Sequence, residues 1–171
     1  MLRRTFTSSL VAIIGGHSVY AQSLRESKLL EPFAEIPWVV AERHTDAYPY
    51  LVRFRQFSED FPRSTYPKRL NIFWSVQEAD DIGLATKQEL ARLHVFEDRL
   101  VEAVEHDKSS VLAAVVTGRG EREFVFFVRN PQEFIGRLSA MPQEAERYPI
   151  EIHLNEDPDW LYFHDLAANK A

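Results

Sequence analysis

The sequence predicts an α+β fold in a single domain, and two features support that prediction. Two stretches, 86–106 and 131–141, carry apolar residues at the three- and four-residue spacing of an amphipathic helix. The segments around them are short, apolar and separated by turn residues, as strands are. With 171 residues, 45% of them hydrophobic, the chain is long enough to bury one core, and it shows no internal repeat.

The longest helix is expected at 86–106. Thr86 and Glu89 form a capping box, in which the hydroxyl and the carboxylate each satisfy an amide of the first turn. The apolar stripe that follows consists of Leu90, Leu93, Leu100, Val101 and Val104. Glu97 falls in the middle of this stripe, so the sequence predicts an ionisable group directed at the core.

Three strands are expected before this helix. Residues 36–43 and 50–57 are expected to form a hairpin whose loop is His44-Thr45-Asp46-Ala47. Residues 69–76 are a stronger strand candidate, because alternate apolar positions would share one face of a sheet. Those positions are Leu70, Ile72, Trp74 and Val76.

Two strongly apolar strands, 111–117 and 122–129, are expected after the helix. Both are apolar almost throughout, which is typical of strands at the centre of a sheet that is covered on both faces. Gly118-Arg119-Gly120 predicts a tight reversal between them.

A second helix, one more strand and a short final helix complete the predicted domain. Asn130 caps the second helix and Pro131 opens it, while Pro142 ends it. The last strand is expected at 148–154. Asp157-Pro158-Asp159 has the cap, the proline and the acid that begin a short helix.

From residue 69 onward, the order is strand, helix, strand, strand, helix, strand. This β-α-β-β-α-β order predicts a ferredoxin-like split βαβ sandwich, with an N-terminal two-strand extension and a short C-terminal helix. Because both helices would pack on one face, the other face must be covered by the extension, the C-terminal segment or another subunit. The apolar side chains expected on that face are Phe73, Val116, Val125 and Phe127.

Residues 1–21 have the pattern of an export signal. Arg3 and Arg4 form a basic start, residues 10–14 form a short apolar centre, and small residues at 19 and 21 predict cleavage after Ala21. The apolar centre is too short to span a bilayer, so no membrane span is expected after signal removal. The alternative interpretation of this segment is a buried N-terminal strand.

The export signal predicts a periplasmic or secreted protein in which residues 22–35 are a spacer and residues 36–171 are the domain. The spacer is polar, and Pro32 limits any helix within it. Arg3-Arg4-Thr5-Phe6 also resembles the twin-arginine export pattern, so the general and the twin-arginine routes both stay open.

Charge and composition exclude several classes of function. The formal net charge is −6, and it becomes −8 without residues 1–21, which carry two arginines and no acid. An acidic domain argues against binding to nucleic acid or to anionic lipid surfaces. The absence of cysteine excludes disulfides, thiolate catalysis and Cys-based zinc sites.

Glu97 is the sharpest candidate for a functional group. Burial raises the pKa of a carboxyl, and such groups concentrate at functional sites. The alternative is a structural hydrogen bond to Arg119, Arg122, Trp160 or a backbone amide, which is how most buried acids are satisfied.

No metal site and no cofactor are expected from the sequence. His94 and Asp98 lie four residues apart on the long helix, but two ligands do not make a site, and a solvent-facing pair explains them. The C-terminal cluster lacks the spacing of known metal motifs, so capping and surface charge explain it. That cluster consists of His153, Asp157, Asp159, His164 and Asp165.

The three tryptophans, Trp38, Trp74 and Trp160, could line a pocket for an apolar ligand or a peptide. Packing already explains their positions on strand and helix faces, so the core is the simpler interpretation.

Five segments together resemble a known family. They are Arg-Leu-Asn-Ile-Phe-Trp at 69–74, Phe-Glu-Asp-Arg-Leu at 96–100, Val-Val-Thr-Gly-Arg-Gly-Glu-Arg-Glu-Phe at 115–124, Asn-Pro-Gln-Glu-Phe at 130–134 and Glu-Asp-Pro-Asp-Trp-Leu-Tyr at 156–162. This set resembles the domain of unknown function 695 family (DUF695) over roughly residues 36–166. That family is similar to the ribonuclease E inhibitor B group, which is cytoplasmic and binds an enzyme. The resemblance implies a fold without known catalytic residues, and the export signal separates this chain from such a target.

Two functions follow as hypotheses. The favoured one is a non-catalytic exported domain that binds a protein or peptide, or a second copy of itself, through a sheet edge or the apolar second face. The alternative is an enzyme or small-ligand binder whose pocket lies between the central helix and Asp157–Tyr162. That pocket requires Glu97, Arg119 or Arg122, and Trp160 to converge.

Overall fold

The computed structural model describes residues 33–44, 49–79 and 85–168. All of them belong to one compact unit, Glu31–Ala171. The expected signal peptide at 1–21, most of the spacer at 22–35 and most of the loop at 44–47 lie outside the described residues.

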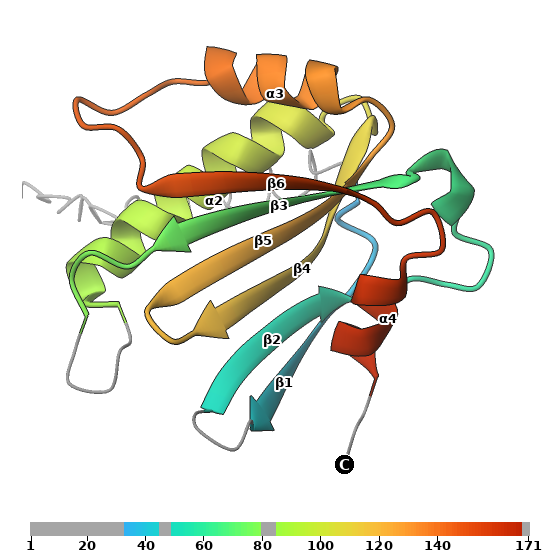
Figure 1. Cartoon of the computed structure of the whole chain (residues 1–171), viewed down its shortest axis with the longest axis horizontal. Coiled ribbons are helices and arrows are strands. Elements are labelled where there is room, and N and C mark those ends of the chain that lie inside the picture. The colour runs from blue at the N-terminus through green and yellow to red at the C-terminus, as the bar shows by residue number, and fades with distance from the viewer. Residues whose placement is uncertain (1–32, 45–48, 80–84, 169–171) are drawn as a thin grey trace, which may run out of the picture. The chain divides into compact units, whose positions relative to one another are not determined.

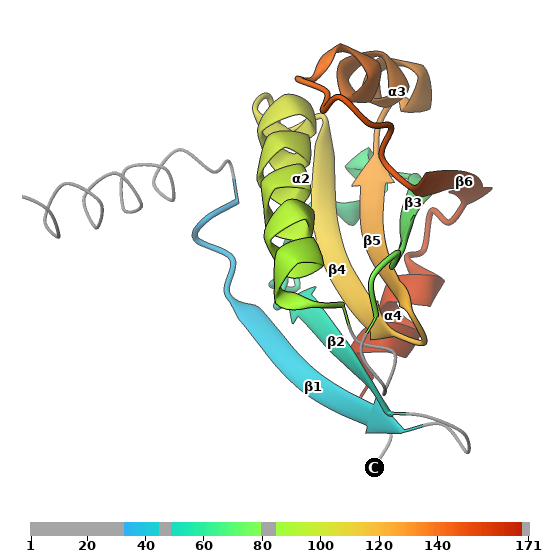
Figure 2. The same ribbon diagram turned by 90° about the vertical axis from the view of Figure 1, so that its left-hand side faces the viewer.

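The fold is α+β, with a six-stranded antiparallel sheet in the order β1-β2-β4-β5-β3-β6 (Figure 1). The strands are β1 (Trp38–His44), β2 (Pro49–Arg55), β3 (Lys68–Ser75), β4 (Ser110–Gly118), β5 (Glu121–Val128) and β6 (Ile150–Glu156). The helices are α2 (Lys87–Glu105), α3 (Pro131–Ala140) and α4 (Leu161–Ala167), with a 3₁₀ turn, η1, at Arg63–Thr65. The helices α2 and α3 cover one face of the sheet and α4 covers the other (Figure 2).

The strand order corrects the expectation of a four-stranded ferredoxin-like sheet. The two extension strands do not cover a face; they continue the sheet beyond β4. The segment Leu51–Phe54 of β2 pairs with Ala114–Thr117 of β4, and β1 pairs with the outer side of β2. The physical reason is that β4 would otherwise present a row of unpaired main-chain groups at the sheet edge.

The helix-covered face of the sheet holds the larger core. From the predicted stripe of α2, Leu93, Leu100 and Val104 are fully buried, while Leu90 and Val101 are partly buried. They pack against alternate residues of β3, as its period-two pattern predicted, and of β5, whereas in β4 a bulge between Leu112 and Ala114 breaks the alternation. The strand residues in this core include Leu70, Ile72, Trp74, Leu112, Val115, Phe124 and Phe126.

The opposite face holds a second core, which we call the second-face cluster. Its fully buried members include Val111, Val125, Phe127, Trp160 and Phe163. Trp160 and Phe163 belong to the C-terminal segment, so that segment covers this face, one of the three coverings considered from the sequence. Of the other residues expected there, Phe73 and Val116 are half-buried.

Local backbone geometry confirms two of the predicted signals. Arg119 and Gly120 both have positive φ, 55° and 72°, which is the conformation of a tight two-residue hairpin turn. Asn130 caps α3 by accepting hydrogen bonds from the amides of Gln132 and Glu133, and Pro131 is the first helical residue.

The final helix begins later than the sequence predicted. It starts at Leu161, because Trp160 has a left-handed φ of 56° that a continuous helix from residue 158 does not allow. Asp157 still provides the cap, since its carboxylate accepts hydrogen bonds from the amides of Leu161 (2.8 Å) and Tyr162 (3.2 Å). Within the described ranges, no helix has the length and apolar character needed to cross a membrane.

Candidate functional site

Glu97 and Trp160 lie on opposite faces of the sheet. Glu97 is half-buried on α2 and forms an ion pair with Arg53 of β2. The indole of Trp160 is fully buried in the second-face cluster, stacked on Phe127 with 3.9 Å between ring centroids. The sheet therefore separates the two residues, and the pocket expected between the central helix and Asp157–Tyr162 is not formed.

Three other candidate residues lie on the α2 side or at the hairpin. Asp98 lies at the surface. Its pKa is raised, mainly because the carboxyl loses part of its hydration and secondly because of the negative charge of Glu97. The Nε of Arg122 donates to the Thr117 hydroxyl at 3.2 Å, and burial lowers the pKa of this guanidinium. His94 is exposed beside Asp98. Among the residues that the structure describes, no group of three or more potential ligands could hold a metal ion.

Glu89, and not Glu97, is the most completely satisfied acid of α2. Its carboxylate accepts hydrogen bonds from the indole of Trp74 (2.9 Å) and from the amides of Gln77 (2.9 Å) and Glu78 (2.5 Å). Burial raises the pKa of Glu89, but these hydrogen bonds outweigh it and the net pKa is lowered. Glu89 thus fixes the chain after β3 against the start of α2.

A second buried acid, Glu105, joins α2 to the extension strands. Its carboxylate lies 3.6 Å from the guanidinium of Arg55, and both side chains are almost wholly buried. Arg55 also donates to the carbonyl of Leu112 at 3.1 Å, and its guanidinium lies over the ring of Trp38 at 4.6 Å. This pair holds β2 against α2, so its role is structural.

The third buried acid, Glu123, is the centre of a polar network on the opposite face. The hydroxyl of Tyr162 donates to both carboxylate oxygens, at 3.0 and 2.9 Å, and the amide of Asn71 donates to one of them at 2.5 Å. The Nε of Arg69 donates to the Asn71 amide oxygen at 3.0 Å, and its guanidinium lies 4.1 Å from the centre of the Tyr162 ring. Residues of β3, β5 and α4 are therefore linked around one carboxylate.

Asp157 connects this network to the start of α4. Besides capping the helix, its carboxylate pairs with Arg69 at 3.2 Å, and it is 6% exposed. Since Arg69 also lies over the Tyr162 ring, the cap and the network share one cation. We refer to Arg69, Asn71, Glu123, Asp157 and Tyr162 as the Glu123 network.

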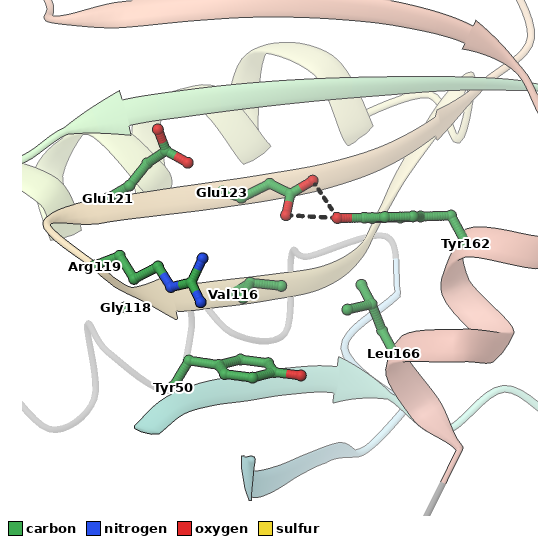
Figure 3. Close-up of a pocket in the computed structure, with 8 residues that line it drawn as sticks. All are labelled: Tyr50, Val116, Gly118, Arg119, Glu121, Glu123, Tyr162 and Leu166. Atoms are coloured by element: carbon green, nitrogen blue, oxygen red, sulfur yellow. Dashed lines mark hydrogen bonds between the residues drawn. The ribbon is translucent and has the colours of Figure 1, made fainter. Parts of the chain in front are cut away.

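A pocket of about 300 Å³ opens beside this network, between the β4–β5 hairpin, β2 and α4 (Figure 3). We call it the hairpin pocket. Its wall is formed by the Tyr50 ring, Val116 and Leu166, while Glu123 and Tyr162 meet at one end. Gly118, Arg119 and Glu121 complete the lining on the hairpin side. Figure 3 shows the Arg119 side chain extending from the hairpin toward Val116, above the Tyr50 ring, and the Glu121 carboxylate on the side of β5 that faces β3.

The environment of the pocket favours the neutral forms of the buried Glu123 and the half-buried Tyr162. Burial raises the pKa of Glu123, and the hydrogen bonds from Tyr162 and Asn71 oppose that rise only in part. Burial, and then the neighbouring Glu123 carboxylate, raises the pKa of Tyr162 well above its ordinary value. The phenol therefore remains a hydrogen-bond donor at neutral pH.

Sequence reasoning found Arg119 and Asp157 but missed Glu123 and Tyr162. A signal for Glu123 was present, because it is two and four residues before Val125 and Phe127 and so shares their face of the strand. An acid at that position had to be buried or to line a cavity. Tyr162 carried no such signal, since its contact depends on where α4 packs.

The fold and site define an α+β domain with one buried carboxylate at the end of a small pocket. The chain belongs to a family of unknown function, DUF695, whose family model matches residues 37–167. No curated protein and no solved structure matches the chain.

Proposed function

We propose that the protein is an exported, non-catalytic domain that binds a peptide segment of another protein, with one basic side chain of that segment in the hairpin pocket. The observation that carries the proposal is the pocket itself, which has an apolar wall and a carboxylate at its end. Lys and Arg combine an apolar stem with a donating, cationic tip, and so match both parts.

The size and hydrogen bonding of the pocket support a single side chain as its occupant. A volume of about 300 Å³ is at the lower end for small-molecule sites. The Glu123 carboxylate accepts from Tyr162 and Asn71, and a carboxylate has about four acceptor positions, so one more donor can be added. A cation placed there would also stabilise the ionised form of Glu123, whose burial is otherwise unfavourable.

Charge supports a basic partner. The formal net charge of the chain is −6, which attracts basic segments over long range and increases their association rate. The lining of the pocket, all within the described part of the chain, includes no Ser, Cys or His, and its Glu123 carboxylate and Tyr162 hydroxyl are already hydrogen-bonded to each other. This supports binding over catalysis.

Two finer interpretations belong with this proposal. Export is supported by the basic start, apolar centre and cleavage pattern of residues 1–21. A ferredoxin-like origin for residues 68–156 is supported by their element order, and by β5 lying between β4 and β3 and running antiparallel to both.

The test uses four short fluorescent peptide libraries that differ only at one fixed position, occupied by Lys, Arg, Leu or Glu. Fluorescence polarisation is expected to show Lys and Arg libraries binding about tenfold or more tightly than the Glu library, about 1.4 kcal/mol. Val116→Trp, which fills the pocket, is expected to abolish the difference. Val40→Trp is the matched control, because Val40 is an exposed β-strand valine on β1, outside the pocket lining.

Three results would contradict the proposal. A preference for the Glu library would assign the pocket to an acidic segment through Arg119. Equal loss in the Val116→Trp and Val40→Trp variants would remove the pocket from the explanation. Binding of free arginine but of no peptide library would favour the small-ligand alternative.

A further inference from the structure

The strand β6 is an open edge of the sheet. It pairs with β3 on one side, and among the described residues no strand pairs with its other side (Figures 1 and 2). The apolar side chains Ile152 and Leu154 are 36% and 52% exposed on this strand. An exposed, apolar edge strand is a template for pairing with another strand.

The direction of the free main-chain groups follows from two hydrogen bonds at the ends of β6. The amide of Ser75 donates to the carbonyl of Pro149, and the amide of Asp157 donates to the carbonyl of Pro67. Odd-numbered residues of β6 therefore form the hydrogen-bonded pairs with β3. The even-numbered residues Ile152, Leu154 and Glu156 therefore direct their N–H and C=O groups to the open edge, whereas the N–H of Ile150 donates to the carbonyl of Tyr148 at 2.9 Å.

We propose that β6 pairs antiparallel with β6 of a second copy of this chain, around a two-fold axis at Ile152. In this register, the two Ile152 residues lie opposite one another and exchange their main-chain hydrogen bonds. Ile150 of each copy lies opposite Leu154 of the other. The result is one continuous sheet through both copies, with an unbroken apolar ladder on the helix-covered face.

Hydrogen-bonding complementarity selects this register. On the other face, Glu151 of each copy lies opposite His153 of the other, so the axis produces two identical acid–imidazole pairs. Within one chain these side chains already contact each other, with the His153 Nε2 and the Glu151 Oε1 2.5 Å apart. A carboxylate can accept a hydrogen bond from an imidazole N–H, whereas two carboxylates directly opposite each other repel.

Neighbouring registers that keep the same hydrogen-bonding pattern are less favourable. An axis at Glu151 places the two Glu151 carboxylates opposite each other. An axis at His153 places the two imidazoles opposite each other and Ile150 against Glu156. The axis at Ile152 pairs every apolar residue of Ile150–Leu154 with another apolar residue.

This dimer is independent of the peptide-binding proposal. The hairpin pocket is lined by β2, the β4–β5 hairpin and α4, whereas β6 forms the opposite edge of the sheet from β1 and β2. The lining residues of the pocket include none from β6, so pairing leaves both pockets open.

Disulfide trapping tests the register directly, because the natural chain has no cysteine. Glu151→Cys and His153→Cys are made separately, in the whole mature protein. Residues directly opposite in a pair that is not hydrogen-bonded have Cα atoms about 4.5 Å apart, within the range of a disulfide. Oxidation is expected to link an equal mixture of the two variants, while each variant alone stays mostly unlinked.

Light scattering of the unmodified chain is expected to give the mass of a dimer. Ile152→Lys is expected to give a monomer, with circular dichroism confirming that it is folded. Val40→Lys is the matched control at the opposite edge of the sheet and is expected to remain a dimer. A monomer at all concentrations in the micromolar range, linkage of Glu151→Cys or His153→Cys alone, or dissociation of Val40→Lys with Ile152→Lys intact would overturn the proposal.

Discussion

At the scale of single residues, the buried acids show what a helical pattern can and cannot predict. The pattern placed Glu97 inside the apolar stripe of α2, yet it is half-buried beside Arg53. Glu89 and Glu105 are the acids of that helix that are nearly inaccessible. Their burial depends on the chain after β3 and on Arg55, which are partners that a single-helix pattern does not contain.

Glu89→Gln is expected to lower the free energy of unfolding by about 2–3 kcal/mol. The glutamine NH2 group would replace a carboxylate oxygen that accepts hydrogen bonds in the wild type, and it would face N–H donors that it cannot accept from. The folded pKa of Glu89 is below its ordinary value of 4.5, so its stabilisation is full above that pH and is lost as the pH falls through the folded pKa. The difference between wild type and variant should therefore shrink in acid. Urea unfolding at several pH values measures it.

Glu97→Gln is the matched control for that experiment. Glu97 is on the same helix, and its partner Arg53 is about one-third exposed. An ion pair with one partner this accessible to solvent contributes about 1 kcal/mol or less. A larger loss in Glu97→Gln than in Glu89→Gln would contradict the assignment of Glu89 as the structural acid.

At the scale of elements, the helices and strands were predicted well and the final helix was not placed correctly. Apolar alternation identifies β3, and the Thr86 hydroxyl does cap α2, accepting from the Glu89 amide. The start of α4 was predicted at residue 158 from Asp157-Pro158, a true capping signal. In the structure Trp160 has a positive φ, its ring is stacked on Phe127, and the helix begins only after it. A local pattern cannot include that tertiary contact.

Trp160→Ala is expected to lower the free energy of unfolding by about 3–5 kcal/mol, because it removes a fully buried indole from the second-face cluster. The indole also donates to the Tyr66 carbonyl at 3.1 Å, so Trp160→Phe should cost less, about 1 kcal/mol for that hydrogen bond plus the lost ring volume. Chemical denaturation measures both. Trp38→Ala, at a half-buried tryptophan of β1, should have the smaller effect, and the reverse order would contradict the role given to Trp160.

At the scale of the whole molecule, the class of fold was predictable and the strand order was not. The period-two pattern of 50–55 puts Arg53 and Arg55 on one face and Val52 and Phe54 on the other. That pattern predicts a strand, but it does not predict which other strand pairs with it. The neighbour is set by the open edge of β4 and by Glu97 and Glu105, which pair with the two arginines.

The export signal expected at residues 1–21 makes a prediction that can be tested directly. If residues 1–21 are removed on export, mass spectrometry of the protein from the periplasm or medium should find an N-terminus at Gln22. The protein without residues 1–21 should fold as the full-length chain does, because the compact unit begins at Glu31. Replacing Arg3 and Arg4 with Gln should retain the protein in the cytoplasm, unprocessed. A processed N-terminus elsewhere, or an intact one outside the cell, would contradict the cleavage after Ala21.

The position of Trp160 and Phe163 in the chain has a consequence for synthesis. Both follow every strand in the sequence, and both seal Val125 and Phe127. A growing polypeptide therefore lacks two of the buried aromatic rings of the second-face cluster until the ribosome has passed residue 163. Until then the ring of Phe127 lacks the indole that stacks on it, so a chain that ends before residue 160 is expected to be less stable than the full domain.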